Sequence, residues 1–92
     1  MTVTWRLFAD LAERAGQRRV SVAVEPTATV GDALAVLLDA RPDLRERVLD
    51  DTADSPAVRD SITVLRDGDP AATDDPVGDA DELALLPPAS GG

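Results

Sequence analysis

Cysteine, histidine and lysine are all absent from this sequence of 92 residues. Without the first two, the chain has no thiol nucleophile, no disulfide and no imidazole base, and it lacks the usual zinc ligands. Activation of a serine or threonine hydroxyl normally needs a neighbouring base such as His or Lys, which is also missing. We therefore predict that the chain is not a catalyst and that it binds no metal or cofactor of its own.

Long apolar runs and a secretory leader are missing too. The apolar fraction is 43%, as in ordinary globular proteins, yet no run approaches the roughly 20 residues that a membrane helix needs. The segment Met1–Arg6 has no basic stretch followed by an apolar one, so a signal peptide is not expected. These features predict a soluble, cytoplasmic protein, and the length predicts one domain with one core.

Positive charge is scarce. Nine arginines stand against eighteen acidic residues, which gives a net charge of -9. Binding to nucleic acid or to anionic membranes rests on Lys and Arg, so neither is expected as a partner. The acidity is consistent either with docking to a basic protein surface or with adaptation to a salt-rich cytoplasm, because molar salt shortens the Debye length to about 3 Å and screens self-repulsion. In composition the chain resembles proteins of halophilic archaea.

The N-terminal quarter of the chain predicts a β-hairpin. Apolar and polar residues alternate over residues 2–8 and again over residues 19–24, which is typical of half-buried strands. A short helix or turn is predicted between them, over residues 9–16. Two strands this close in sequence most simply pair in antiparallel fashion. Trp5 and Phe8, the only aromatic residues, are expected in the core.

A helix is predicted after Thr29. The pattern of Thr29 and Asp32 supplies an oxygen acceptor and a negative charge to the free amides of a helix start. Pro42 ends this helix and can begin a second short one that runs to Arg47 or Val48. Five apolar residues at helical spacing form the stripe that should face a sheet: Val30, Ala33, Leu34, Leu37 and Leu38.

Two further strands are predicted in the second half of the chain, over residues 61–66 and 82–86. Asp67-Gly68 indicates a hairpin turn, and residues 50–56 and 69–81 are predicted as acidic loops. The resulting order is strand, strand, helix, short helix, strand, strand. This order favours a two-layer α+β domain.

The last residues are the most informative part of the sequence. Pro87 and Pro88 stop the final strand and stiffen the base of a tail. Ser90 is interpreted as a small spacer, and the absence of side chains on Gly91 and Gly92 would let another protein close around the backbone. An alternative interpretation is a frayed terminus or a remnant of cloning.

A terminal carboxylate acquires acylating power only when ATP converts it to an acyl adenylate. Attack by sulfur then gives a thiocarboxylate, and attack by an amine gives an amide. We therefore predict a folded domain over residues 1–88, a flexible tail over residues 89–92, and Gly92 as the reactive group.

Four segments of the sequence resemble the small subunit of molybdopterin synthase, and they resemble the haloarchaeal small ubiquitin-like modifiers still more closely. They are Trp5–Ala12, Thr29–Leu34, Val64–Gly68 and Asp81–Gly92. The resemblance implies a β-grasp (ubiquitin-like) fold, with a mixed sheet of four to five strands and one main helix packed on one face. It also implies that the last strand lies parallel beside the first.

The same resemblance implies a protein modifier and sulfur carrier. An E1-like enzyme would use ATP to activate Gly92. The products would be an isopeptide bond to target-protein lysines, reversible by an isopeptidase, or a thiocarboxylate for tRNA thiolation or, with the large subunit of molybdopterin synthase, for molybdopterin synthesis. Partners would dock on an apolar face around Phe8, Leu83 and Leu85. The free chain is expected to be a monomer.

Two other functions stay open at the level of sequence. A non-covalent β-grasp interaction module would use its sheet face and leave the tail unmodified. A hydrolase would need paired carboxylates, for which Asp50 with Asp51 and Asp74 with Asp75 are the candidates. The hydrolase is disfavoured because adjacent acids usually lie in solvated loops.

Overall fold

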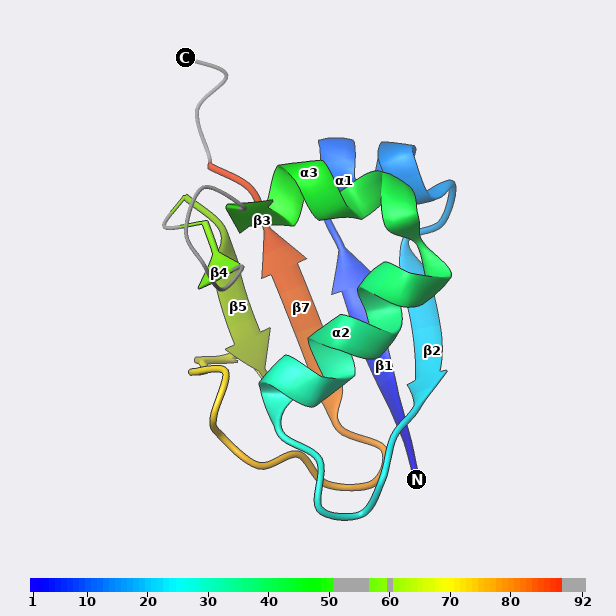
Figure 1. Ribbon diagram of the computed structural model, residues 1–92, viewed down its shortest axis with the longest axis vertical. Coiled ribbons are helices and arrows are strands. Elements are labelled where there is room, and N and C mark those ends of the chain that lie inside the picture. The colour runs from blue at the N-terminus through cyan, green and yellow to red at the C-terminus, as the bar shows by residue number, and fades with distance from the viewer. Residues whose placement is uncertain (51–56, 60, 89–92) are drawn as a thin grey trace.

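The computed structural model describes residues 1–50, 57–59 and 61–88. It shows a mixed sheet of five strands, a separate pair of two short strands, and helices packed close by (Figure 1). The elements in chain order are β1 (Thr2–Leu7), α1 (Asp10–Ala15), β2 (Arg19–Ala23), α2 (Val30–Ala40), the 3-10 helix η1 (Pro42–Leu44), α3 (Arg45–Val48), β3 (Leu49–Asp50), β4 (Ala57–Val58), β5 (Thr63–Arg66), β6 (Asp69–Pro70) and β7 (Glu82–Leu86).

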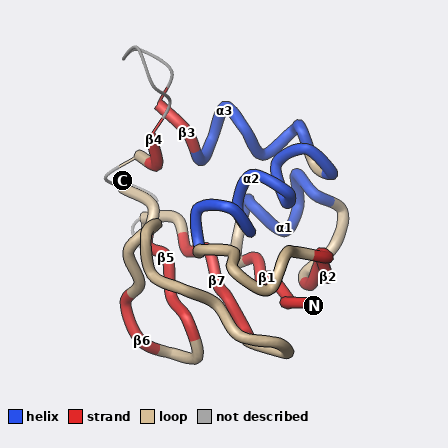
Figure 2. Tube along the Cα trace, turned by 60° about the horizontal axis from the view of Figure 1, so that its bottom comes forward, coloured by secondary structure: helices blue, strands red, loops and turns tan. Residues whose placement is uncertain are grey.

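The first and last strands lie side by side in the middle of the sheet. The strand order is β2-β1-β7-β5-β6, and β1 and β7 run parallel with Leu7 opposite Leu85. The predicted hairpin of β1 and β2 is present and antiparallel, and β7 also pairs antiparallel with β5. With α2 laid across one face, this is the predicted β-grasp arrangement (Figures 1 and 2).

The main helix begins where the sequence predicts. The Thr29 hydroxyl accepts a hydrogen bond from the Asp32 amide at 3.2 Å, and the Asp32 carboxylate accepts one from the Thr29 amide at 3.0 Å. This reciprocal pair satisfies two amides that no helix turn can reach. After Ala40 the chain leaves the helix, and Pro42 begins η1 as expected. At 11 residues α2 is the longest helix, and none of the helices in the described ranges could cross a membrane.

The layer between α2 and the sheet is apolar. Among the described residues, no polar or charged side chain is buried. Trp5 is fully buried, and its indole N–H donates to the Ala33 carbonyl of α2 at 3.2 Å, which connects sheet and helix. Phe8, which was expected in the core, is only half-buried. The described core therefore consists mainly of Leu and Val, with Trp5, Ile62 and two alanines.

Three short strands were not predicted. β3 pairs with β4, so Asp50 lies in a strand and not in a loop; residues 51–56 of that predicted loop lie outside the described residues. β6 pairs with β5, so the expected loop over residues 69–81 begins with two strand residues. A strand of two residues shows no alternation, which is why the pattern missed it.

The predicted turn at Asp67-Gly68 is confirmed. It connects β5 to β6, and both residues have positive φ, 50° for Asp67 and 89° for Gly68. Hairpin turns of this kind match the right-handed twist of the strands, and Asp and Gly adopt the left-handed region more readily than most residues.

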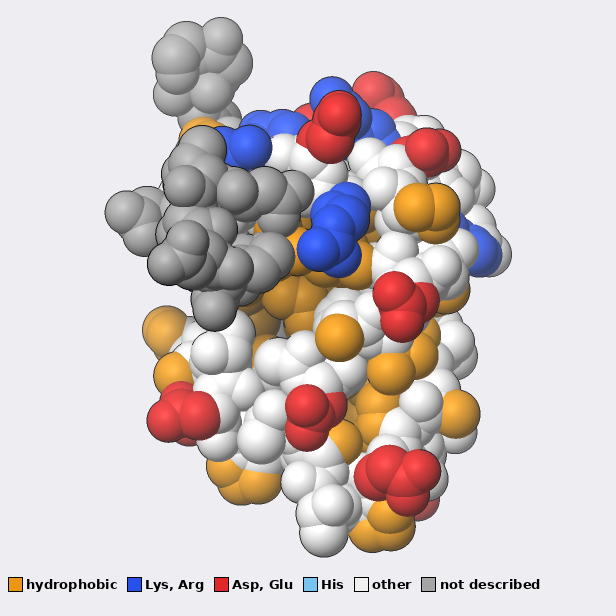
Figure 3. Space-filling model, viewed as in Figure 1, with side chains coloured by type: hydrophobic (Ala, Val, Ile, Leu, Met, Phe, Trp, Pro, Cys, Tyr) orange, Lys and Arg blue, Asp and Glu red, His pale blue; other side chains and the backbone are white. Residues whose placement is uncertain are grey.

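The surface charges form few ion pairs in the described part of the chain. One of them joins Arg47 of α3 to Asp10 of α1, at 2.9 Å. Acidic side chains are spread over the face that carries α2, among apolar and neutral ones (Figure 3). Exposed pairs of this kind contribute little to stability, so packing must supply most of it.

Loss of the helix cap should measurably destabilise the fold. Thr29→Ala removes the acceptor for the Asp32 amide and should lower the free energy of unfolding by about 1 kcal/mol. Urea unfolding followed by circular dichroism measures the change. Thr27→Ala is the matched control, because Thr27 is exposed, and it should change stability by less than about 0.5 kcal/mol. Equal effects of the two substitutions would contradict the assignment of the cap.

Candidate functional site

The root of the tail lies at one end of the central strand. β7 ends at Leu86, which pairs with Thr63 at the start of β5. Pro87 follows half-buried and Pro88 exposed, so the chain reaches the surface directly after the strand (Figure 1). The predicted site residues Ser90, Gly91 and Gly92 lie outside the described residues.

The prediction that Leu83 and Leu85 form a docking face is wrong. Both side chains are 0% exposed and belong to the core beneath α2. The alternation in β7 correctly predicted that the two leucines share one face of the sheet. That face is the one that α2 covers. These two leucines stabilise the fold and cannot contact a partner in the folded protein.

The opposite face of the sheet carries apolar side chains that are only partly buried, so a partner can reach them. Ala84 and Leu86 alternate with the buried leucines of β7 and are half-buried. Leu65 of β5 lies opposite Ala84 in the register. Phe8 directly follows Leu7, whose partner in β7 is Leu85, so it lies beside Leu86. We call Phe8, Leu65, Ala84 and Leu86 the open-face patch, and it borders the root of the tail.

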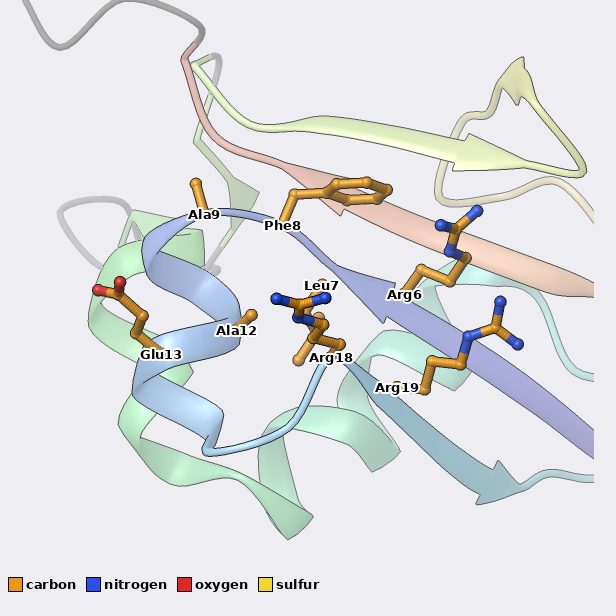
Figure 4. A pocket seen from close by; sticks show the side chains of 8 residues that line it. All are labelled: Arg6, Leu7, Phe8, Ala9, Ala12, Glu13, Arg18 and Arg19. Atoms are coloured by element: carbon orange, nitrogen blue, oxygen red, sulfur yellow. The ribbon is translucent and has the colours of Figure 1, made fainter.

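A group of arginines adjoins this patch, in a hollow between the end of β1, α1 and the start of β2 (Figure 4). The Arg6 guanidinium lies over the Phe8 ring, 5.2 Å from its centroid, in a cation–π contact. Arg18 and Arg19 line the same hollow. Glu82 is 3.4 Å from Arg6 and 4.0 Å from Arg19 and partly balances their charge.

Sequence reasoning missed this cluster. The Arg18 side chain has no hydrogen bond or ion pair within the described part of the chain, so its charge is free for a partner. Arg6 occupies an outward position of an alternating strand, and Arg18-Arg19 begins the next one. An antiparallel hairpin brings these positions together at one end of the sheet. The predicted hairpin therefore contained enough information to find the cluster.

A backbone turn fixes Phe8 at the edge of the hollow. Ala9 has φ 53° and ψ -128°, a conformation that residues other than Gly rarely adopt. The Phe8 carbonyl accepts a hydrogen bond from the Leu11 amide at 3.1 Å. The chain thus leaves β1 abruptly and enters α1, with Leu11 buried and Phe8 left towards the open face. Strain of this type costs about 1–3 kcal/mol and is tolerated only where surrounding contacts hold it.

Asp74 and Asp75, the candidate pair that lies wholly within the described residues, belong to a loop. The Asp75 carboxylate accepts a hydrogen bond from the Ala72 amide at 2.9 Å, which closes a local turn, and Asp74 is exposed. Asp50 belongs to β3, and Asp51 lies outside the described residues. The structure therefore gives the Asp75 carboxylate a role in loop geometry.

Comparison with known proteins agrees with the fold and with the resemblance. The ThiS family matches residues 5–92. Small archaeal modifier protein 1 of Haloferax volcanii is 52% identical over 88 residues, which cover 96% of this chain and 98% of that protein. The crystal structure of the Haloferax volcanii protein superposes with a TM-score of 0.93 at 50% identity, over the full length of both chains.

A more distant match shares the fold. A complex of subunits 1 and 2 of the molybdopterin-converting factor from Helicobacter pylori contains a chain that is 18% identical, with a TM-score of 0.64 over all of both chains. At this identity the likeness shows the fold alone. The β-grasp prediction and the predicted resemblance are confirmed, and the chain belongs to the ThiS family as a homologue of small archaeal modifier protein 1.

Proposed function

We propose that this chain is a ubiquitin-like protein modifier and sulfur carrier whose reactive group is the carboxylate of Gly92. The observation that supports this most strongly is the 52% identity to small archaeal modifier protein 1, over nearly the whole of both chains. The family match also runs through the Gly-Gly pair to residue 92. The alternative of a purely non-covalent module is not favoured, because the relative is a modifier.

The proposed chemistry has two steps, the first at the α-phosphorus of ATP and the second at the carboxyl carbon of Gly92. In the first, an E1-like enzyme lets the Gly92 carboxylate attack the α-phosphate of ATP, which forms an acyl adenylate and releases pyrophosphate. In the second, a sulfur nucleophile or a lysine amine attacks the acyl carbon, and AMP leaves with the bonding electrons. The first nucleophile gives a thiocarboxylate and the second an amide. Partners would supply every catalytic group, since this chain has no Cys, His or Lys.

The tail suits delivery into a narrow active site. Residues 87–92 have no large side chain, and fully extended they would span about 20 Å. Pro87 and Pro88 restrict the direction in which the chain leaves β7. We infer that these prolines, Ser90 and Gly91 are read by the activating enzyme, and that Gly92 is the residue it modifies.

The open-face patch is the proposed docking surface, in place of Leu83 and Leu85. It lies beside the tail root, so a partner that covers it is placed to receive the tail. The adjacent arginines favour a partner surface that is apolar in its centre and acidic at the side of Arg18 and Arg19. A large subunit of molybdopterin synthase is proposed for this surface because a protein of the same fold occurs in a complex of subunits 1 and 2 of the molybdopterin-converting factor. An E1-like enzyme is proposed for it because that enzyme must receive the adjacent tail.

The proposal also covers the targets of Gly92 and the compartment in which the chain acts. Target-protein lysines would receive Gly92, and an isopeptidase would remove it again. The site of action would be the cytoplasm, where ATP is available to the activating enzyme. Thiocarboxylate formed there would supply sulfur for molybdopterin or for tRNA thiolation.

The first experiment asks whether Gly92 is activated. Incubation with the cognate activating enzyme, ATP and sulfide should increase the intact mass by the difference between one sulfur and one oxygen atom. Deletion of Gly91 and Gly92 should abolish this change, whereas Ala89→Ser, a small change at a tail residue outside the set proposed for recognition, should retain it. An unchanged mass for the full chain under conditions that consume ATP would rule out the carrier role.

The second experiment concerns the architecture of conjugates. Because the chain has no lysine, no second copy can be joined to one of its side chains through an isopeptide bond. Conjugates isolated from cells should therefore carry single, unbranched copies on each target lysine. Mass spectrometry of digested conjugates checks this, and a Gly92 remnant on any internal residue of this chain would refute it.

The third experiment separates docking from folding. Leu86→Ala should lower kcat/KM for activation by about tenfold while changing the free energy of unfolding by less than about 1 kcal/mol, because Leu86 lies in the open-face patch. Leu85→Ala should cost about 2–5 kcal/mol of stability, because it leaves a cavity in the core. Val36→Ala, on the far side of the sheet, is the control and should leave activation unchanged. Normal activation of Leu86→Ala would remove the open-face patch from the proposal.

A further inference from the structure

The outer edge of β2 is unpaired. β2 stands first in the strand order, and β1 is its one strand neighbour within the described ranges. It lies at the right-hand margin of the sheet in Figure 1, and none of the described helices or strands pairs with its outer side. An edge of this kind offers backbone donors and acceptors to another extended chain.

The register of the hairpin identifies which backbone groups point outward. Met1 and Val24 exchange both main-chain hydrogen bonds, at 2.9 and 2.8 Å, and the Leu7 amide donates to the Arg18 carbonyl at 2.8 Å. Hydrogen-bonded pairs alternate along an antiparallel ladder. The main-chain amides and carbonyls of the even-numbered residues of β2 therefore point towards β1. The amides and carbonyls of Arg19, Ser21 and Ala23 therefore face outward, where the described part of the chain has no strand to receive them.

A groove runs beside the end of this edge, between β2, the following loop and α2. Its apolar lining comes from Ala23, Val24, Ala28 and Val36. Val36 is 36% exposed and is the one large apolar side chain that counts as exposed among the described residues. Figure 3 shows apolar side chains among acidic ones on this side of the molecule. We call these residues, together with Glu25 and Asp32, the β2 groove.

The charges along the edge differ in sign. Glu25 and Asp32 border the β2 groove at the end of the strand. Arg18 and Arg19 stand at the other end, and Arg18 has no ion pair within the described residues. An extended peptide that lies along β2 would therefore be favoured in one direction, with its basic end beside the two carboxylates.

We propose that the outer edge of β2 and the β2 groove bind an extended segment of a partner protein, as an added antiparallel strand. The segment carries Lys or Arg at its N-terminal end, beside Glu25 and Asp32. Aliphatic residues follow at alternate positions, so that those facing α2 pack against Val36. Main-chain hydrogen bonds to Arg19, Ser21 and Ala23 supply affinity that does not depend on sequence, and the groove and its charges supply selectivity.

This site goes beyond the carrier chemistry, and the β2 groove lies away from the root of the tail. Ala23 lies opposite Thr2, at the end of the sheet where β7 begins, whereas the tail leaves from the other end of β7. The groove is on the α2 side of the sheet, and the open-face patch is on the reverse. A chain whose Gly92 is already joined to a target could thus still present the β2 edge to a reader.

The test is a titration of the full chain, followed by amide NMR, with the blocked peptide Lys-Lys-Val-Thr-Val-Thr-Val. Binding should shift the amides of Arg19, Ser21 and Ala23 and slow their exchange with solvent. A second peptide with Glu-Glu in place of Lys-Lys should bind about threefold more weakly or worse. Glu25→Lys should reverse this preference.

The groove is tested by variants of α2. Val36→Ser should weaken binding of the first peptide by about tenfold, because it removes most of the apolar contact. Ala35→Ser is the matched control: Ala35 is exposed on the same helix but outside the groove, and its variant should bind within about twofold of the unchanged chain. The amide spectra of both variants report directly whether each is folded.

Three results would overturn the proposal. The first is the absence of any shift at millimolar peptide, or shifts confined to the open-face patch. The second is equal affinity of the unchanged chain for both peptides. The third is a concentration-dependent dimer that Val36→Ser abolishes, because the occupant of the edge would then be a second copy of this chain. Activation of Gly92 is measured independently, so failure of the peptide experiment leaves the carrier proposal standing.

Discussion

The apolar layer between α2 and the sheet determines where every surface of this protein lies. Trp5 and the two leucines of β7 are fully buried in it, with no polar side chain beside them among the described residues. Because Leu83 and Leu85 must face α2, Ala84 and Leu86 must face the other way. The open-face patch and the exit direction of the tail are thus consequences of core packing. The same layer puts Val36 on the rim of α2 and leaves the β2 edge uncovered.

Local patterns predicted the elements well, because each depends on neighbours in sequence. Alternation located the longer strands, and the Thr29 cap located the start of α2. These patterns do not show which elements pack against each other. Because β7 carries apolar residues on both faces, alternation could not tell which face α2 covers. That is why Leu83 and Leu85 were wrongly placed on the surface. The parallel pairing of β7 with β1 was expected from the resemblance and not from the residues themselves.

Total charge gave an incomplete picture of partner choice. A net charge of -9 suggested a basic partner, if any. The β1–β2 hairpin nevertheless brings Arg6, Arg18 and Arg19 together next to Phe8, so the region beside the tail is locally basic. Charges further away than a Debye length are screened, so the charges next to the docking surface affect a partner more than the net charge does. In strong salt the apolar contact would carry the affinity, and the arginines would mainly fix orientation.

The central position of β7 also bears on how the protein is made. During translation β7 emerges after all the other described strands. Until then the edges of β1 and β5 that pair with β7 are unpaired, and the core lacks Leu83 and Leu85. A product cut short before Glu82 would lack both its tail and the middle strand of its sheet. Because β1 and β5 pair only through β7, such a product could not form this sheet, so the same strand that completes the fold also carries the tail.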